Sequence, residues 1–104
     1  MAEGPELKLV TVIVQHSDEK KVLDAALGAG APGATYFYGR GTGVRQKLGM
    51  LGWLIEAEKV IMLMAVPPDK LDAVVKAVTR AAELDKPGKG LLCVHTVHQV
   101  VGLG

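Results

Sequence analysis

The sequence KVIMLMAVPPDKLDAVVKAVTRAA, residues 59–82, joins an apolar strand pattern directly to an amphipathic helix pattern. After the opening lysine, the next seven residues are all apolar, which favours a strand. Asp69 is expected to cap the helix that follows. The apolar side chains of that helix recur at helical spacing and mark one buried face. They are Leu71, Val74, Val75, Val78 and Ala82. A strand followed by a helix is therefore predicted here.

The residues on either side of this stretch complete a β-α-β-β-α-β order. The predicted strands cover residues 7–14, 34–38, 59–66 and 90–101. The first of them is rich in β-branched side chains, and the second and third could pair as a hairpin. Ser17 is expected to cap a first helix that ends near Gly28. This order is that of the ferredoxin-like α+β sandwich, a four-stranded antiparallel sheet with two helices on one face.

The chain is expected to form one domain, residues 1–104, and to assemble with further copies of itself. Its length of 104 residues is within the usual size of a single domain. In the last predicted strand, residues 91–101 are largely apolar on both faces. Two helices cover only one face of such a sheet, so another subunit is expected to cover the other face. An interface between subunits is then a candidate ligand site.

Charge and targeting patterns exclude several classes of partner. The net charge of +1 gives no field that would favour nucleic acid. The one cysteine, Cys93, is expected to be a small buried residue, and the first residues do not resemble a signal peptide, so a cytoplasmic location is expected. The longest apolar run, residues 60–68, is far shorter than the roughly 20 residues that cross a bilayer, so membrane insertion is not expected.

No catalytic or metal-binding pattern is recognisable in the sequence. There is no His-Glu-x-x-His motif, no cysteine pair and no convergent nucleophile and base. His95 and His98 lie an odd number of positions apart in the last predicted strand, which places them on opposite faces. No catalytic residue, metal ligand or prosthetic group is therefore predicted, and the protein is not expected to be an enzyme.

Two glycine-rich basic segments indicate a phosphate site. Residues 39–47, GRGTGVRQK, combine three glycines, three cations and one amide. Glycine lets backbone N–H groups approach an oxyanion, and arginine and lysine supply donors that match phosphate. Residues 85–90, DKPGKG, form a second such segment between the second helix and the last strand. Neither has the Walker or dinucleotide-binding spacing. The alternative is that both are solvated connections without a ligand.

Three segments together resemble the PII signalling proteins. They are Gly33-Ala34-Thr35, then Gly41-Thr42-Gly43 with Arg45-Gln46-Lys47, and the turn Lys86-Pro87-Gly88-Lys89-Gly90. PII proteins are trimers that bind adenine nucleotides in the clefts between subunits. They regulate transporters, enzymes or transcription factors by moving a long loop. The resemblance therefore implies a homotrimeric sensor of an adenine nucleotide rather than a catalyst.

The resemblance also implies roles for individual residues. Gly33 and Thr35 would border the adenine pocket, while residues 41–47 and 86–90 would surround the phosphates from two sides. The nucleotide-binding residues implied in this way are Gly33, Thr35, Gly41, Thr42, Gly43, Arg45, Gln46, Lys47, Lys86, Pro87, Gly88, Lys89 and Gly90. Arg40 and Trp53 would belong to the loop that binds the regulated partner. Packing of Trp53 beneath its own loop is an equal alternative.

Three departures from the family pattern limit what is carried over. Only eleven residues separate Lys47 from Lys59, so the long loop is short and lacks a tyrosine or serine for covalent control. The turn reads Gly-Lys-Gly at 88–90, where the family has an acidic residue between glycines followed by lysine. The last residues contain no arginine, although the family uses arginines there to reach the phosphates.

These departures favour AMP, ADP or cyclic AMP over tightly bound ATP, with magnesium or bicarbonate as candidate second ligands. The regulated partner implied for such a short-loop relative is a membrane transporter. The alternative hypothesis is a trimeric ferredoxin-like structural or metal-tolerance protein that senses no nucleotide.

Overall fold

The computed structural model describes residues 6–41 and 58–102. Thr42, Gly43, Arg45, Gln46, Lys47 and Trp53 lie outside these ranges. The elements are β1 (Lys8–Gln15), a 3-10 turn η1 (His16–Asp18), α1 (Glu19–Gly28), β2 (Thr35–Arg40), β3 (Glu58–Val66), α2 (Pro68–Ala82) and β4 (Gly90–Thr96). The predicted β-α-β-β-α-β order is confirmed.

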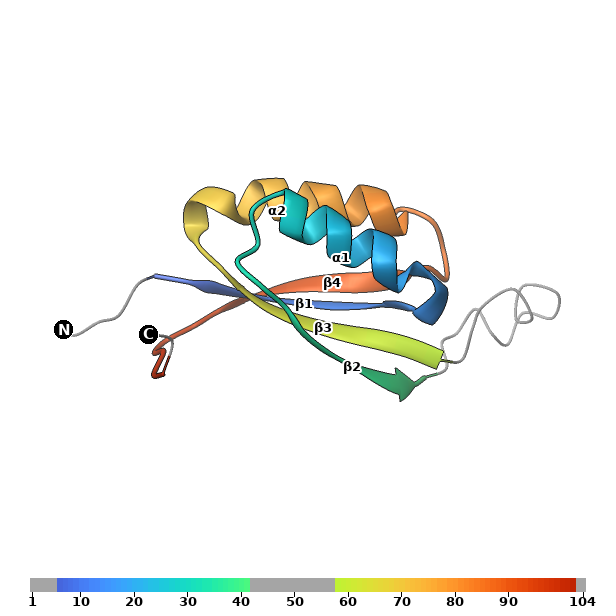
Figure 1. The fold of residues 1–104 in the computed structure, drawn as a ribbon, viewed down its shortest axis with the longest axis horizontal. Coiled ribbons are helices and arrows are strands. Elements are labelled where there is room, and N and C mark those ends of the chain that lie inside the picture. The colour runs from blue at the N-terminus through green and yellow to red at the C-terminus, as the bar shows by residue number, and fades with distance from the viewer. Residues whose placement is uncertain (1–5, 42–57, 103–104) are drawn as a thin grey trace, which may run out of the picture.

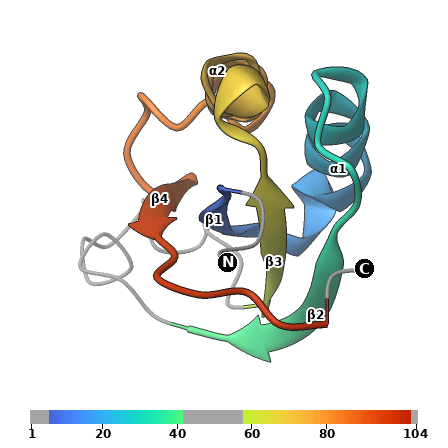
Figure 2. The same cartoon turned by 90° about the vertical axis from the view of Figure 1, so that its left-hand side faces the viewer.

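The four strands form one antiparallel sheet in the order β2-β3-β1-β4. The predicted hairpin between β2 and β3 is present, with Thr35 opposite Leu63 and Arg40 opposite Glu58. Both helices lie on the same face of the sheet, side by side (Figures 1 and 2). This is the predicted ferredoxin-like sandwich. Within the described ranges, neither helix is long and apolar enough to cross a membrane.

The core lies between the sheet and the helices and follows directly from the sequence periodicities. Alternate residues of the two central strands point towards the helices, because side chains alternate across a strand. They are Val10, Val12, Val14, Val60, Met62, Met64 and Val66. The helices contribute Val22, Ala26, Val74, Val78 and Ala82, at the spacing of one helical face. All of these side chains are almost completely buried.

The opposite face of the sheet carries apolar side chains that no helix or strand of the described residues covers. Leu91 is opposite Ile13 and Phe37 is opposite Ile61, and both Leu91 and Phe37 are about half exposed. Cys93 lies opposite Thr11 on this face and is exposed. The expectation that Cys93 is buried is therefore wrong for the single chain, because its strand position turns it away from the helices.

Three local predictions differ from the structure. Strand β4 ends at Thr96, which pairs with Lys8, the first residue of β1, so residues 97–101 have no β1 partner and His98 lies outside the strand. Helix α1 begins one residue after Asp18, because a 3-10 turn that includes Ser17 precedes it. Helix α2 begins at Pro68, whose fixed φ suits a first helical position, so Asp69 lies in the first turn rather than at the cap.

Candidate functional site

The two glycine-rich segments reach the same end of the sheet but on its two outer strands. At this end Arg40 pairs with Glu58, Lys59 pairs with Gln15, and Gly90 pairs with Val14. Strands β2 and β4 are separated by β3 and β1, so three strand spacings of about 4.8 Å place them roughly 14 Å apart. Within a single chain, the described start of the first segment, residues 39–41, and the turn before β4 are therefore too far apart to touch one phosphate group together.

The segment before β4 is shaped by glycine. Gly90 has a φ of 140°, and a Cβ at this position would clash with the backbone oxygen of Ile13 on the neighbouring strand. Gly88 has a φ of 80°, which an L side chain also rarely adopts. The nearly buried Gln15 donates a hydrogen bond from Nε2 to the Gly88 oxygen over 3.1 Å. The turn is thus fixed to the end of β1.

Lys89, assigned to the phosphates by the resemblance, is paired with two carboxylates of its own chain. Its Nζ lies 3.4 Å from Oδ2 of Asp18 and 3.8 Å from Oε1 of Glu83. The Asp18 side chain is only 8% exposed, and its Oδ2 has no hydrogen bond, so the contact with Lys89 is ionic. Lys21 lies 3.4 Å from the other oxygen of Asp18. A buried carboxylate therefore holds two lysines at the junction of η1 and the turn.

Lys86, the other cation of this turn, also pairs with Glu83. Its Nζ donates to Oε2 of Glu83 over 3.1 Å. This hydrogen bond, with the charge of Lys86, lowers the pKa of the Glu83 carboxyl below its ordinary value of 4.5. Glu83 follows the last residue of α2 in a left-handed conformation, with a φ of 54°. The end of α2 thus supplies an acidic residue that contacts both lysines of the turn.

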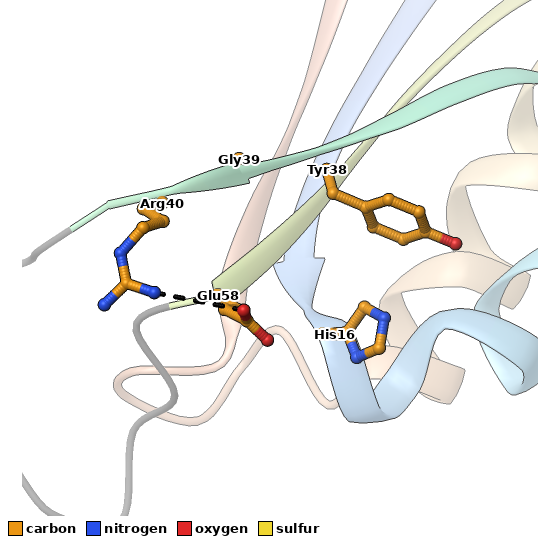
Figure 3. Close-up of a pocket in the computed structure, with 5 residues that line it drawn as sticks. All are labelled: His16, Tyr38, Gly39, Arg40 and Glu58. Carbon is orange, nitrogen blue, oxygen red and sulfur yellow. Dashed lines mark ion pairs between the residues drawn. The ribbon is translucent and has the colours of Figure 1, made fainter.

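The end of β2 borders a separate hollow of about 310 Å³. His16, Tyr38, Gly39, Arg40 and Glu58 line it, and Figure 3 shows Arg40 and Glu58 joined at one side, with Tyr38 and His16 at the other. Arg40 Nη1 lies 3.9 Å from Oε2 of Glu58, and both side chains are largely exposed, so this pair is weak. The Arg40 guanidinium is therefore available to an incoming anion.

Two aromatic rings and a carboxylate connect this hollow to the start of α1. The Tyr38 hydroxyl donates to Oε1 of Glu19 over 2.9 Å, and the Tyr38 ring meets the His16 ring edge-on with centroids 5.0 Å apart. The hydrogen bond to Glu19 raises the pKa of the Tyr38 phenol above its ordinary value of 10.0. These two contacts fix hydrogen-bond donors and acceptors at the rim of the hollow. Neither contact joins a nucleophile to a general base.

The two residues assigned to the adenine lie near the other end of β2. Thr35 begins this strand and Arg40 ends it, so five residues at about 3.4 Å each place them roughly 17 Å apart. Gly33 precedes the strand, and a Cβ added there would meet nothing within 4 Å. The described part of the predicted site is therefore an elongated strip along one edge strand, completed by the turn before β4 on the far edge.

Sequence reasoning did not identify three residues that shape the turn: Gln15, Asp18 and Glu83. Gln15 is a polar residue at the end of an apolar strand. That position could have indicated a side chain that donates a hydrogen bond to a neighbouring loop. Asp18 and Glu83 are unremarkable helix-terminal acids in the sequence. Among the residues that the structure describes, no group of three or more His, Cys, Asp or Glu side chains could hold a metal ion.

Comparison with known proteins places this geometry in a family. The family model of the nitrogen regulatory protein P-II matches residues 7–103. A crystal structure of PII from Arabidopsis thaliana bound to citrate has the same fold, with a TM-score of 0.71 and 24% sequence identity. That match covers 95% of this chain and 84% of the Arabidopsis chain. The sequence has no significant match among curated proteins. Because the family match extends over nearly the whole chain, the protein belongs to the nitrogen regulatory protein P-II family.

Proposed function

We propose that this protein is a homotrimeric signalling protein that binds an adenine nucleotide between subunits. Membership of the P-II family supports a regulatory rather than a catalytic role. One observation carries the proposal: at the same end of the sheet, the first candidate phosphate segment leaves the outer strand β2 and the second enters the other outer strand, β4. A second copy that brings its β4 turn beside β2 would unite the two halves.

The open face of the sheet supports assembly. Phe37 and Leu91 are 50% and 48% exposed in the single chain. Phe37 and Leu91 lie on the face away from the helices, where burial against other copies would be favourable. Light scattering of the purified protein should give the mass of a trimer. A monomeric mass at micromolar concentration would leave the two halves of the site apart and refute the proposal.

The charges of the β4 turn favour a nucleotide with few phosphates. Lys86 and Lys89 both pair with carboxylates of their own chain, so each added phosphate gains less than it would from unpaired cations. We therefore favour AMP, ADP or cyclic AMP over ATP, held by Gly41, Thr42, Gly43, Arg45, Gln46 and Lys47 from one subunit and by residues 86–90 from the next. Gly33 and Thr35 would border the adenine. The citrate in the Arabidopsis structure is also an anion, which supports an anionic ligand for this fold.

Calorimetric titration with AMP, ADP, ATP and cyclic AMP, with and without magnesium and bicarbonate, tests the ligand. Saturable binding of one nucleotide per subunit would support the proposal and rank the ligands. A trimer that binds none of them would instead favour a structural protein of the same fold.

The sensor would act by binding a regulated partner protein. We propose that this partner is a membrane transporter and that Arg40 and Trp53 contact it. Hydrogen exchange across residues 39–53 should change when the best nucleotide is added at saturation. Equal exchange in both states would mean that the signal leaves through another surface.

A further inference from the structure

We infer that Asp18 is the resident counter-ion of Lys89 and limits how tightly this protein binds a phosphate-bearing ligand. The inference rests on the proposed function, because it concerns the same site, and it adds a residue and a mechanism that control its affinity. In the free protein the Asp18 carboxylate pairs with the ammonium group of Lys89, and a ligand phosphate must compete with Asp18 for that ammonium group.

The contact geometry makes Asp18 the main competitor. Its carboxylate is 8% exposed and lies 3.4 Å from Lys89, whose side chain is 23% exposed. A partly desolvated ion pair is less screened by water and salt than a surface pair. Glu83 also contacts Lys89, but it is farther away at 3.8 Å and 43% exposed, so water competes with that contact. Most of the restraint on Lys89 therefore comes from Asp18.

The other ion pairs make the exchange feasible. Lys21 contacts Oδ1 of Asp18, the oxygen that Lys89 does not face, so the carboxylate keeps one cation when Lys89 leaves. Glu83 keeps its shorter contact with Lys86, at 3.1 Å. A phosphate at the turn can thus draw Lys89 away without leaving either acid wholly unpaired. The Asp18 Oδ2 atom, which has no hydrogen bond, nevertheless remains buried, and this opposes release.

Asp18→Asn tests the inference, because it removes the charge and preserves the size of the side chain. We expect ADP to bind about tenfold more tightly to this variant in calorimetry, since Lys89 no longer has a buried competitor. Asp24→Asn is the matched control: it removes the same charge from α1, where the carboxylate pairs only with the exposed Lys20 among the contacts described. Its ADP affinity should stay within about twofold of the parent protein.

Lys89→Gln tests whether the effect of Asp18 acts through Lys89. The gain from Asp18→Asn should disappear in the double variant, and Lys89→Gln alone should weaken ADP binding because it removes the ammonium group for which the phosphate and Asp18 compete. An unchanged affinity in Asp18→Asn, or a gain that persists without Lys89, would overturn the inference while ADP binding by the parent protein upheld the proposed function. If Asp18→Asn did not fold, unchanged ADP binding in Lys89→Gln would overturn it.

A ligand-free measurement separates the two proposals when no form of the protein binds ADP. Acetylation of lysine amines, followed by mass spectrometry, reports how freely each amine can leave its contacts and react. Lys89 should react faster in Asp18→Asn than in the parent protein, relative to the exposed Lys76 in the same sample. A rise would support the counter-ion even if nucleotide sensing failed, and no change would refute it.

Discussion

The two outer strands of the sheet hold their halves of the candidate site in different ways. At the β4 edge, the nearly buried Gln15 and Asp18 fix the turn by a hydrogen bond and an ion pair. At the β2 edge, the ion pair seen for Arg40 within the described ranges is a 3.9 Å contact with Glu58, and both side chains are largely exposed. The β4 half of the site is therefore held by contacts within the fold, while the Arg40 side chain at the β2 half is exposed and can bind an anionic ligand.

This difference suggests a division of roles between the edges. A preformed turn loses little conformational freedom when a ligand binds, and so contributes mainly to affinity. A side chain held only by a screened surface pair can change partners at small expense, and so can transmit the presence of a ligand. We expect substitutions that disrupt the β4 turn to lower stability as well as affinity, and substitutions at the β2 edge and its loop to change binding with little loss of stability.

The largest effect should come from Gly90→Ala. The added Cβ would meet the backbone of Ile13 at a φ of 140°, so the first pair of β4 with β1 must shift. We expect the free energy of unfolding to fall by at least about 3 kcal/mol, as for other changes that force a strained backbone. Urea denaturation measures this.

Gly33→Ala is the matched control at the β2 edge. Apart from its chain neighbours, no atom of the described residues lies within 4 Å of its added Cβ, so stability should change by less than about 0.5 kcal/mol. If both variants were equally stable, the β4 turn would not be fixed as described. Loss of nucleotide binding by a fully stable Gly33→Ala variant would support its place beside the adenine.

Arg45→Ala and Lys47→Ala should produce the reverse pattern. Both are assigned to the phosphate by the family resemblance, and losing a charge-assisted hydrogen bond should weaken nucleotide binding by about 1.5–3 kcal/mol. Thermal unfolding without ligand should change little. Unchanged affinity in both variants, together with loss of binding in Lys89→Ala, would place the dominant phosphate contacts at the β4 edge alone.

Gln15→Ala should have a smaller effect, restricted to the β4 turn. It removes the 3.1 Å hydrogen bond to the Gly88 oxygen, which should lower the free energy of unfolding by about 1 kcal/mol. Amide exchange in residues 86–90 should accelerate more than exchange in β2. Uniform acceleration over the whole chain would show that the hydrogen bond stabilises the sheet in general rather than the turn.

The fold was predictable because its determinants are periodic. The alternation from Val10 to Val14 and from Val60 to Val66, and the helical spacing of Val74, Val78 and Ala82, each identify an element and its buried face. Element ends were less predictable. Pro68 starts α2 through its fixed φ, and β4 stops where β1 begins, which is a property of the register rather than of residues 97–101.

The candidate site was only partly predictable for a related reason. Glycines and lysines at 86–90 marked a turn suited to an anion, but their sequence did not reveal that Asp18, about 70 residues earlier, lies against Lys89. Contacts between distant segments depend on strand order and on which edge each loop reaches. Strand order also explains why the two segments that look alike in sequence adjoin opposite edge strands, β2 and β4.

The smallest expected effects are two titrations that distinguish the edges. At the β4 edge, the hydrogen bond from Lys86 lowers the pKa of Glu83 below 4.5, so this pair contributes stability above that pH and loses it as the pH falls through the folded value. At the β2 edge, the hydrogen bond to Glu19 raises the pKa of Tyr38 above 10.0. That contribution is complete below pH 10 and is lost as the pH rises through the folded value.

Both pKa values can be measured on single groups. Carboxyl NMR should give a Glu83 midpoint below 4.5 that returns towards it in Lys86→Met. The chain has two tyrosines, so Tyr36→Phe leaves tyrosinate absorbance to report Tyr38 alone, with a midpoint above 10.0 that falls in Glu19→Ala. Because both groups are exposed, the effect on unfolding should be slight. A Tyr38 midpoint insensitive to Glu19 would mean that the hydrogen bond does not persist in solution, and that the β2 edge is held to α1 even more loosely than its contacts indicate.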